Sequence, residues 1–440
     1  MNTMQISSEE LCSLFQSFVR KDRRNRITAD RLDQVRENAL NGFVGTICAV
    51  LISFMASIFP ARGPVTYHSS IDRDAPGARL TKLRRGINTS HWFAQVSNKI
   101  GYTKAHLETH TTAEDIALIK AMGFDHIRFG LDPAPLFNAE APENLTTQYL
   151  GYVDHAIDMI LKAGLAVVVD IHPSDEFKKN LVDDKHVEAF RKFWRALAKH
   201  MSSRDPERVF LEVINEPVIE DGYRWMGIQS KLIAAIREGA PRHTIIATGH
   251  RWSSPNEFLF LEPVADQKVI YNFHFYEPHL FTHQGATWGW ELWRYLKLVP
   301  YPSSPEAVAP ILPAISNQQL RAALVKYGED RWDAPRIDRE IAAIAAWAKK
   351  YNVYLTCNEF GVYRKVVAPG DRAAWIKDVR TSLENYGIGW AMWDYKAGFD
   401  VVNKVNGRAV PDPETVAALG LKPIASNQVK RSAPAKAGEH

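Results

Sequence analysis

From Leu83 onward, short apolar runs alternate with longer segments in which apolar residues recur at the spacing of a helix. This alternation is typical of βα units, which build a parallel sheet. Eight of the short runs predict strands, near Arg85 to Asn88, His126 to Gly130, Ala166 to Ile171, Val209 to Ile214, Thr244 to Thr248, Val269 to His274, Val353 to Cys357, and Gly389 to Trp393.

The segments between these runs carry apolar stripes that predict amphipathic helices with one face toward a core. The stripes consist of Leu150, Val153, Ile157, Ile160 and Leu161; Val187, Phe190, Phe193, Trp194 and Leu197; Ile337, Ile341 and Ile344; and Trp375, Ile376, Val379 and Leu383. Gly164 and Gly387 stand where helix C-caps are expected. Eight βα units over residues 83–422 predict an α/β fold closed as a (β/α)8 TIM barrel.

The segment between the sixth and seventh predicted strands is much longer than the others. It contains an insertion at about residues 283–335, which holds the aromatic run from Thr282 to Trp293 and the proline-rich run from Val299 to Pro305. A long segment of this kind is expected to rise over the barrel face where substrates bind.

The N-terminal part has a different pattern. Residues 38–61 carry no charge and are long enough to cross a bilayer as a helix, which predicts a transmembrane anchor. The preceding region, residues 1–37, contains basic residues that favour an inside N-terminus, namely Arg20, Lys21, Arg23, Arg24, Arg26, Arg31 and Arg36. Basic residues that follow the segment weaken this orientation. Residues 62–82, rich in Pro, Gly, Ser and Asp, are expected to be a linker.

Two other interpretations of residues 38–61 stay open. A secretory signal peptide would explain the apolar run, although its basic region is unusually long and no clean small-x-small cleavage site follows. A buried helix of a soluble protein is the other alternative. We expect the barrel to be membrane-anchored and to face away from the cytoplasm, or to be secreted or periplasmic. Residues 423–440 are expected to be a disordered tail.

Composition excludes several classes of protein. The chain has 440 residues, of which 46% are apolar and 24% charged, as in ordinary globular proteins. Lys and Arg number 54 against 50 Asp and Glu and are scattered, so nucleic acid is not an expected partner. Of the three cysteines, only Cys357 falls in the predicted barrel, which excludes an internal disulfide or a cysteine metal site.

In a TIM barrel the functional groups sit at the C-terminal ends of the strands. In this sequence those ends are polar throughout, with Asn88 and His91, Arg128, Asp170 and His172, Asn215 and Glu216, His250, His274 and Tyr276, Asn358 and Glu359, and Trp393. Glu216 follows the fourth strand and Glu359 follows the seventh, so the two carboxylates can face each other across the barrel mouth.

Such a pair is what a retaining glycosidase needs, because one carboxyl protonates the leaving oxygen while the other attacks the anomeric carbon. We expect Glu216 to be the general acid and base, and Glu359 to be the nucleophile. Arg128 and the Tyr276 hydroxyl can keep Glu359 ionised, whereas burial and nearby negative charge raise the pKa of Glu216. Asn215 can bind a sugar hydroxyl.

These residues resemble the functional pattern of glycoside hydrolase family five, the cellulase-like retaining glycosidases. The resemblance covers about residues 83–400 and includes the positions of Arg128, His172, Asn215, Glu216, His274, Tyr276, Glu359 and Trp393. It implies that Glu216 is the acid and base, that Glu359 is the nucleophile, and that the other residues bind the sugar next to the cleaved bond. It does not explain the N-terminal segment or the long insertion.

The resemblance implies an endo-β-1,4-glucanase that acts on β-glucan without a metal or another cofactor, and we expect a monomer. A β-mannanase, or a β-glucanase for 1,3 or mixed linkages, stays open because the same eight residues serve those substrates. Weaker candidates for sugar contact lie in loops after strands one, five and six, namely Trp92, Trp252, Trp288, Trp290, Trp293, His91, His250, His279 and His283. Anchoring of the loops explains those tryptophans equally well.

Two other functions are possible for a barrel with these residues. A metal-dependent barrel hydrolase would use Asp170, His172 and His274, but the first strand ends Ile87-Asn-Thr-Ser90 and lacks the His-x-His pair usual in such barrels. A non-catalytic sugar-binding barrel would be expected to have lost Glu216 or Glu359, and the sequence has both.

Overall fold

The computed structural model describes residues 76–405 and 408–424. The predicted basic region, the apolar segment 38–61, most of the predicted linker and the tail beyond Ile424 lie outside the described residues. Within the two described ranges, no helix combines the length and the apolar character needed to cross a membrane.

Eight parallel strands close into a barrel in chain order, which confirms the predicted TIM barrel. The strands are β1 Arg85–Asn88, β2 His126–Leu131, β3 Ala166–Ile171, β4 Val209–Glu212, β5 Thr244–Thr248, β6 Val269–Phe275, β7 Leu355–Phe360 and β8 Gly389–Met392. Strands β1, β3 and β5 have the predicted bounds. The predicted bounds of β7 are wrong, because the strand continues past Cys357 through an irregularity described below.

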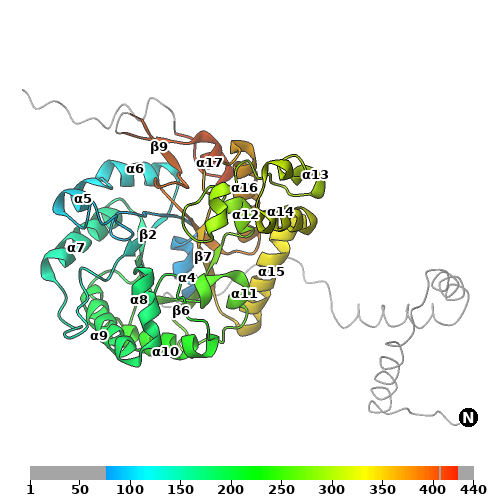
Figure 1. The fold of residues 1–440 in the computed structure, drawn as a ribbon. Helices are drawn as coiled ribbons and strands as arrows, with labels where there is room; N and C mark the ends of the chain where they lie inside the picture. The colour runs from blue at the N-terminus through cyan, green and yellow to red at the C-terminus, as the bar shows by residue number, and fades with distance from the viewer. Residues whose placement is uncertain (1–75, 406–407, 425–440) are drawn as a thin grey trace, which may run out of the picture. The chain divides into compact units, whose positions relative to one another are not determined.

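Figure 1 shows the larger helices, among them α7, α9, α10, α15 and α16, arranged around the strands. The helices are α4 Pro76–Arg79, α5 Lys104–Thr109, α6 Ala113–Met122, α7 Thr147–Lys162, α8 Asp175–Lys179, α9 Asp184–Met201, α10 Gly222–Gly239, α11 Pro255–Phe258, α12 His279–Thr282, α13 Pro305–Val308, α14 Gln318–Asp330, α15 Ala334–Tyr351, α16 Pro369–Asn385 and α17 Pro413–Ala418. Short 3-10 turns are η2 Leu80–Lys82, η3 Asn180–Val182, η4 Arg251–Ser253, η5 Glu291–Tyr295 and η6 Leu312–Ala314.

The predicted stripes are the buried faces of α7, α9, α15 and α16. Leu161 is the exception, since it is only partly buried at the end of α7. Gly164 follows the C-cap of α7 with a φ of 76°, a left-handed conformation that glycine adopts without steric cost.

The inward side chains of β3 to β6 change from apolar to polar toward the C-terminal ends of the strands. An apolar cluster inside the barrel includes Val168, Phe210, Ile246 and Ile270. Two residues further along the same strands stand Asp170, Glu212, Thr248 and Asn272, all fully buried. Because alternate residues of a strand share one face, the barrel has an apolar lower layer and a polar upper layer.

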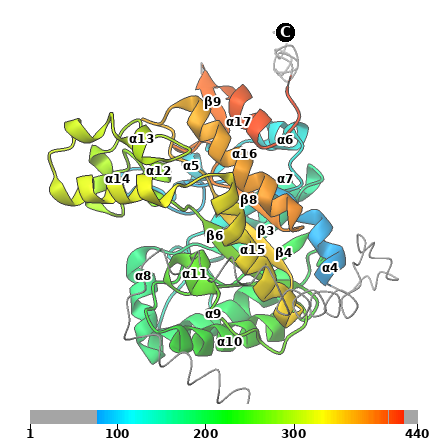
Figure 2. The same cartoon turned by 90° about the vertical axis from the view of Figure 1, so that its right-hand side faces the viewer.

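The insertion between β6 and β7 folds into α12, η5, α13, η6 and α14, and α13 and α14 lie side by side (Figure 2). After β8 the chain forms an antiparallel hairpin, β9 Val402–Val405 with β10 Arg408–Pro411, and then α17. Residues 76–82, the last part of the predicted linker, form α4 and η2. Arg79 at the end of α4 is buried, and its Nε donates to Glu207 Oε1 at 2.7 Å.

Candidate active site

A cleft of about 1560 Å³ opens at the C-terminal ends of the strands. Its walls contain all but one of the predicted site residues, namely His172, Asn215, Glu216, His274, Tyr276, Glu359 and Trp393. Arg128 is absent from the cleft wall, is 1% exposed, and lies beneath the floor in contact with Glu359.

Glu216 lies just beyond the end of β4 and reaches the cleft, with 22% of its side chain exposed. Its φ of 44° is unusual for a residue with a Cβ, and such conformations concentrate at functional sites. His274 Nδ1 donates to Glu216 Oε1 at 2.8 Å. Burial raises the pKa of Glu216 above its ordinary value. The carboxyl is therefore held so that it can carry a proton to a bound molecule.

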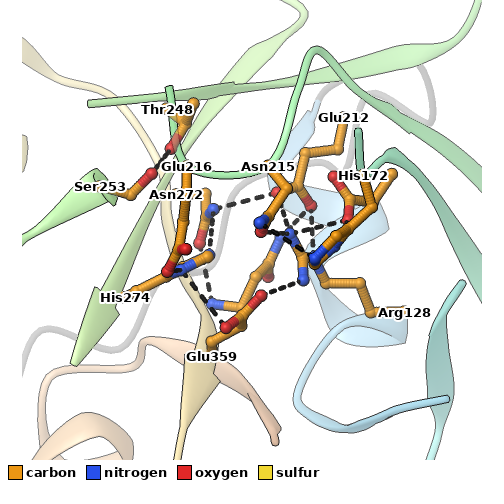
Figure 3. Close-up of polar contacts among 12 residues, drawn as sticks. Arg128, His172, Glu212, Asn215, Glu216, Thr248, Ser253, Asn272, His274 and Glu359 are labelled. Carbon is orange, nitrogen blue, oxygen red and sulfur yellow. Dashed lines mark hydrogen bonds and ion pairs between the residues drawn. The ribbon is translucent and has the colours of Figure 1, made fainter. Parts of the chain in front are cut away.

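Glu359 lies in β7 and has both carboxylate oxygens engaged. Arg128 Nη1 donates to Oε1 at 2.6 Å, and the Tyr276 hydroxyl donates to Oε2 at 2.9 Å. Burial and the neighbouring Glu359 raise the pKa of Tyr276 well above its ordinary value, so the phenol keeps its proton and stays a donor. Hydrogen bonds to a carboxylate favour its charged form. Figure 3 shows Glu359 between the guanidinium and the Glu216–His274 pair.

The two carboxylates are close together. One oxygen of each lies within 4.8 Å of the other, and the same limit includes a ring nitrogen of His274. His274 Nδ1 is 2.8 Å from Glu216 and 3.6 Å from Glu359. Retaining glycosidases have carboxyl groups about 5 to 5.5 Å apart, whereas inverting enzymes need about 6.5 to 9.5 Å to admit a water molecule.

Arg128 links the floor of the cleft to the barrel interior. It binds Glu212 through two hydrogen bonds of 2.9 and 2.8 Å, and it lies 3.0 Å from Asp170. Its remaining donors bind the side-chain oxygens of Asn88 and Asn215 at 3.0 and 2.9 Å. Burial raises the pKa of Glu212 and raises that of Asp170 to about 6. One guanidinium thus orients three strand-borne carboxylates, because its planar fork presents several donors in fixed directions.

The two buried histidines are neutral donors and acceptors. Burial lowers the pKa of His172 to about 3 and that of His274 to about 4. His172 Nδ1 donates to Asp170 Oδ2 at 2.9 Å, and its Nε2 accepts from the Asn215 amide at 3.2 Å. His274 Nε2 accepts from Asn272 Nδ2 at 3.3 Å, which leaves Nδ1 to donate to Glu216. These bonds fix one tautomer of each ring.

An irregularity in β7 turns Glu359 into the barrel mouth. Phe273 pairs with Cys357, but the next residue, His274, pairs with Glu359, so Asn358 is an extra residue in the strand. As in other β-bulges, successive side chains then fall on the same side. Asn358 Nδ2 donates to Glu212 at 2.7 Å while Glu359 reaches Arg128. The amide of Asn272 accepts from the backbone N–H of Asn358 at 2.8 Å and so satisfies the unpaired group.

Trp393 stands at the end of β8 with its ring stacked on His172, at 5.7 Å between centroids and 19° between planes. It is partly buried in the cleft wall, where its flat face can pack against the C–H surface of a sugar. The hypothesis of a sugar platform at Trp92 is wrong, because this ring is fully buried and its Nε1 donates to Leu107 O at 2.8 Å.

The other weaker candidates for sugar contact comprise residues that line the cleft and one that does not. The cleft wall includes Trp252, Trp288, Trp290, Trp293, His91, His279 and His283. His250 does not line the cleft, since it is 5% exposed with Nε2 placed 3.2 Å from Glu257. His279 and Trp293 stack nearly parallel, with 6° between their planes, so part of the predicted insertion forms an aromatic wall.

The sequence prediction missed three residues of the site. Glu212 and Asn272 lie below the cleft, and Lys178 lies in its wall. Two features of the sequence could have identified Glu212 and Asn272. Each is a polar residue inside an apolar run, Val209-Phe-Leu-Glu and Val269-Ile-Tyr-Asn-Phe, and polar side chains in buried strands need partners. Nothing in the sequence pattern distinguishes Lys178 from its exposed neighbour Lys179.

Within the described ranges, Glu216, His274 and Glu359 are the group whose geometry could hold a metal ion. Both oxygens of Glu359 already accept hydrogen bonds, from Arg128 and from the Tyr276 hydroxyl. The positive charge of the Arg128 guanidinium also repels a cation from Glu359 Oε1. Asp170 and His172, which a metal-dependent hydrolase would use as metal ligands, form a hydrogen bond with each other. The donor set therefore suits acid and base chemistry better than metal ligation.

Comparison with protein families gives a match over residues 85–398 to the model of the cellulase family, glycosyl hydrolase family 5. Among curated relatives, Endoglucanase C of Acetivibrio thermocellus is 28% identical over 333 residues, which covers 74% of this chain and 95% of the relative. Cellodextrinase A of Ruminococcus flavefaciens is 27% identical over 316 residues, covering 69% of this chain and 83% of the relative.

Solved structures show the same similarity. Cel5A of Thermotoga maritima in complex with cellobiose has a TM-score of 0.64 and 25% identity, and the match covers 78% of this chain and 99% of that chain. A second structure of Cel5A, with mannotriose, has a TM-score of 0.64 and 24% identity over 78% of this chain and 99% of that chain.

Proposed function

The chain belongs to the cellulase family, glycosyl hydrolase family 5, and we propose that it is a retaining endo-β-1,4-glucanase. As a glycoside hydrolase of this family it cleaves glycosidic bonds. The proposal adds the stereochemistry, the substrate and the roles of the residues. Glu216 acts as the general acid and base, and Glu359 acts as the nucleophile.

The observation that carries the proposal is the separation of the two carboxylates, within 4.8 Å between one oxygen of each. This limit agrees with the short carboxyl separation of retaining enzymes and is below the separation of about 6.5 to 9.5 Å that admits a water molecule in inverting enzymes. It supports direct attack by a carboxylate and net retention of configuration, in place of the single displacement by water that inverts the anomeric centre.

In the first step, a carboxylate oxygen of Glu359 forms a bond to the anomeric carbon while the bond from that carbon to the glycosidic oxygen breaks. The proton of Glu216 passes to the leaving oxygen. In the second step, Glu216 takes a proton from a water molecule, whose oxygen attacks the same carbon and releases Glu359 as a carboxylate. Each glutamate ends the cycle in its starting protonation state.

The surroundings support these separate roles. Glu359 receives a charged donor and a phenol donor, which favour its ionised form. Among the described residues, Glu216 receives its hydrogen bond from a neutral histidine and lacks a charged donor of the kind that Glu359 has, and its partial burial raises its pKa and favours the protonated form. Different surroundings of two carboxyl groups are what distinguishes an acid from a nucleophile.

Substrate class follows from the cleft and the relatives. A cleft of about 1560 Å³ exceeds the roughly 300 to 1,000 Å³ usual for small-ligand sites, which suits an oligomeric chain bound across the site. The relative from Acetivibrio thermocellus is named an endoglucanase, and these similarities support β-1,4-glucan. Mannan is the second candidate, because Cel5A of Thermotoga maritima was solved with mannotriose as well as with cellobiose.

The test is hydrolysis of carboxymethylcellulose, mixed-linkage β-glucan, laminarin and mannan, with the anomer of the first product followed by NMR. We expect the highest rate on a β-1,4-glucan and initial release of the β-anomer. Initial release of the α-anomer would exclude the retaining mechanism. Absence of activity on every β-glycan would exclude the proposed function, and a preference for mannan would select the second candidate.

The pH profile of kcat/KM is expected to show the deprotonation of Glu216 on its alkaline side. Because Glu216 must be protonated to assist departure of the sugar, kcat/KM is expected to fall as pH rises through its pKa. Burial raises that pKa above the ordinary value of 4.5, so the fall is expected at higher pH than for a solvent-exposed glutamate. A kcat/KM profile on a soluble glucan measures this. A rate that keeps rising above neutral pH would contradict the role of Glu216.

A further inference from the structure

Lys178 is a buried lysine in the wall of the cleft. It belongs to the short helix α8, which follows His172 at the end of β3. Only 4% of the residue is exposed, yet it lines the same cleft as Glu216 and His172. Lysine is almost never buried to this extent unless its charge is paired.

The neighbouring residue holds α8 in place. Phe177 packs edge-on against Phe137, His186 and Phe190, with ring centroids 5.3, 4.5 and 5.1 Å apart. Because Phe137 follows β2, and His186 and Phe190 belong to α9, this aromatic cluster packs α8 against those two segments. Lys178 follows immediately and lines the cleft, so packing of Phe177 fixes the position from which the lysine extends.

Lys178 lacks a strong protein partner. Its nearest anion is Asp175 one turn earlier, at 3.7 Å, and the carboxylate side chain of Asp175 is 79% exposed. In the portion of the chain that the structure describes, Nζ has no hydrogen-bond acceptor beyond this loose ion pair. An ammonium group offers three donors, and the ion pair with Asp175 leaves donors of Nζ available to the cleft. An acceptor supplied by a ligand in the cleft would complete it.

We propose that Lys178 is a substrate-binding residue whose ammonium group donates hydrogen bonds to hydroxyl oxygens of the glucan beside Glu216. This inference rests on the proposed function, since it takes a β-glucan as the ligand. It adds a residue outside the eight on which the family resemblance was based, and it places a specificity contact on α8.

A second consequence follows for the acid. Burial raises the pKa of Glu216, whereas the charges of Lys178 and Arg128 and the His172 ring oppose the increase, and Asp175 adds to it. His274 and Glu359 also face this carboxyl, at the distances given above. Removing the ammonium charge should therefore raise the pKa of Glu216. The alkaline limb of the pH profile would move to higher pH, which loss of packing alone would not cause.

The experiment compares Lys178→Met with Lys178→Arg, using cellohexaose as substrate. Methionine keeps most of the volume and removes the donors, whereas arginine keeps a charged donor. We expect Lys178→Met to lower kcat/KM by roughly 10- to 100-fold, mainly through KM, and to shift the alkaline limb upward. Lys178→Arg should recover part of the loss. The matched control is Lys179→Met, an exposed neighbour outside the cleft wall, which should behave as wild type.

The inference is overturned if Lys178→Met keeps kcat/KM within about twofold of wild type, or if the arginine variant loses as much as the methionine variant. Thermal unfolding of each variant checks the fold. Should Lys178→Met fail to fold, Lys178→Gln and Lys178→Arg are compared by the same two measurements. An inactive wild-type enzyme would instead mark failure of the proposed function, so the two failures are distinguishable.

Discussion

Replacing Glu359 by Gln is expected to lower kcat/KM on cellohexaose by roughly 10⁴- to 10⁶-fold, the size of loss seen when an enzyme loses its nucleophile. The amide oxygen is a poor nucleophile and cannot form the ester to the anomeric carbon. The change preserves the shape of the side chain, and its amide oxygen can still accept the hydrogen bond from Arg128, with the amide N–H2 turned toward the Tyr276 oxygen, which can accept. Binding of the substrate should therefore survive the loss of turnover.

Calorimetric titration of Glu359→Gln with cellohexaose measures binding, and the release of reducing ends measures turnover. Glu262→Gln, at an exposed position outside the cleft wall, is the control for a glutamate-to-glutamine change and should retain full activity. Turnover by Glu359→Gln within tenfold of wild type would rule out Glu359 as the nucleophile.

The second large effect is expected for Glu216→Ala, and its size should depend on the leaving group. With cellohexaose, loss of the proton donor should lower kcat by roughly 10²- to 10⁴-fold. With an aryl cellobioside whose phenol is acidic, the first step needs little protonation and should stay fast. The second step then becomes limiting, because no base activates the water molecule.

Added azide distinguishes the specific loss of the general base in Glu216→Ala from a general disruption of the active site. Azide needs no general base, so it should attack the glycosyl-enzyme, increase the rate with the aryl cellobioside, and give a β-glycosyl azide. Product analysis by NMR identifies the azide. Equal losses with both substrates, together with no effect of azide, would contradict the assignment of Glu216 as the acid and base.

The fold could be predicted because the spacing of apolar residues identifies each strand and helix, and the order of these elements along the chain determines the barrel. Eight apolar runs, with amphipathic stripes in four of the segments between them, specify a parallel barrel, and the polar residues at the strand ends specify its functional face. Glu216 and Glu359 could be paired in advance for the same reason, since strands four and seven present their ends at one barrel mouth.

The support beneath the two glutamates was not predictable from pattern. Glu212 looked like one charge in an apolar run, and only the closed barrel shows that Arg128, Asn272 and Asn358 come from three other strands to surround it. Such contacts depend on strand register, which a hydrophobic pattern does not contain. The same reason explains the error at β7, where an extra residue extends pairing beyond the predicted end.

The extra residue Asn358 creates a conflict between regular backbone pairing in β7 and the orientation of Glu359. A β7 strand of regular register would complete its ladder, and a design method that rewards only backbone pairing and packing would favour it. In that register Glu359 would turn from the barrel mouth toward the surrounding helices. Stabilising redesign of this enzyme is therefore expected to remove its activity first at β7, because a regular strand there would no longer direct Glu359 into the barrel mouth.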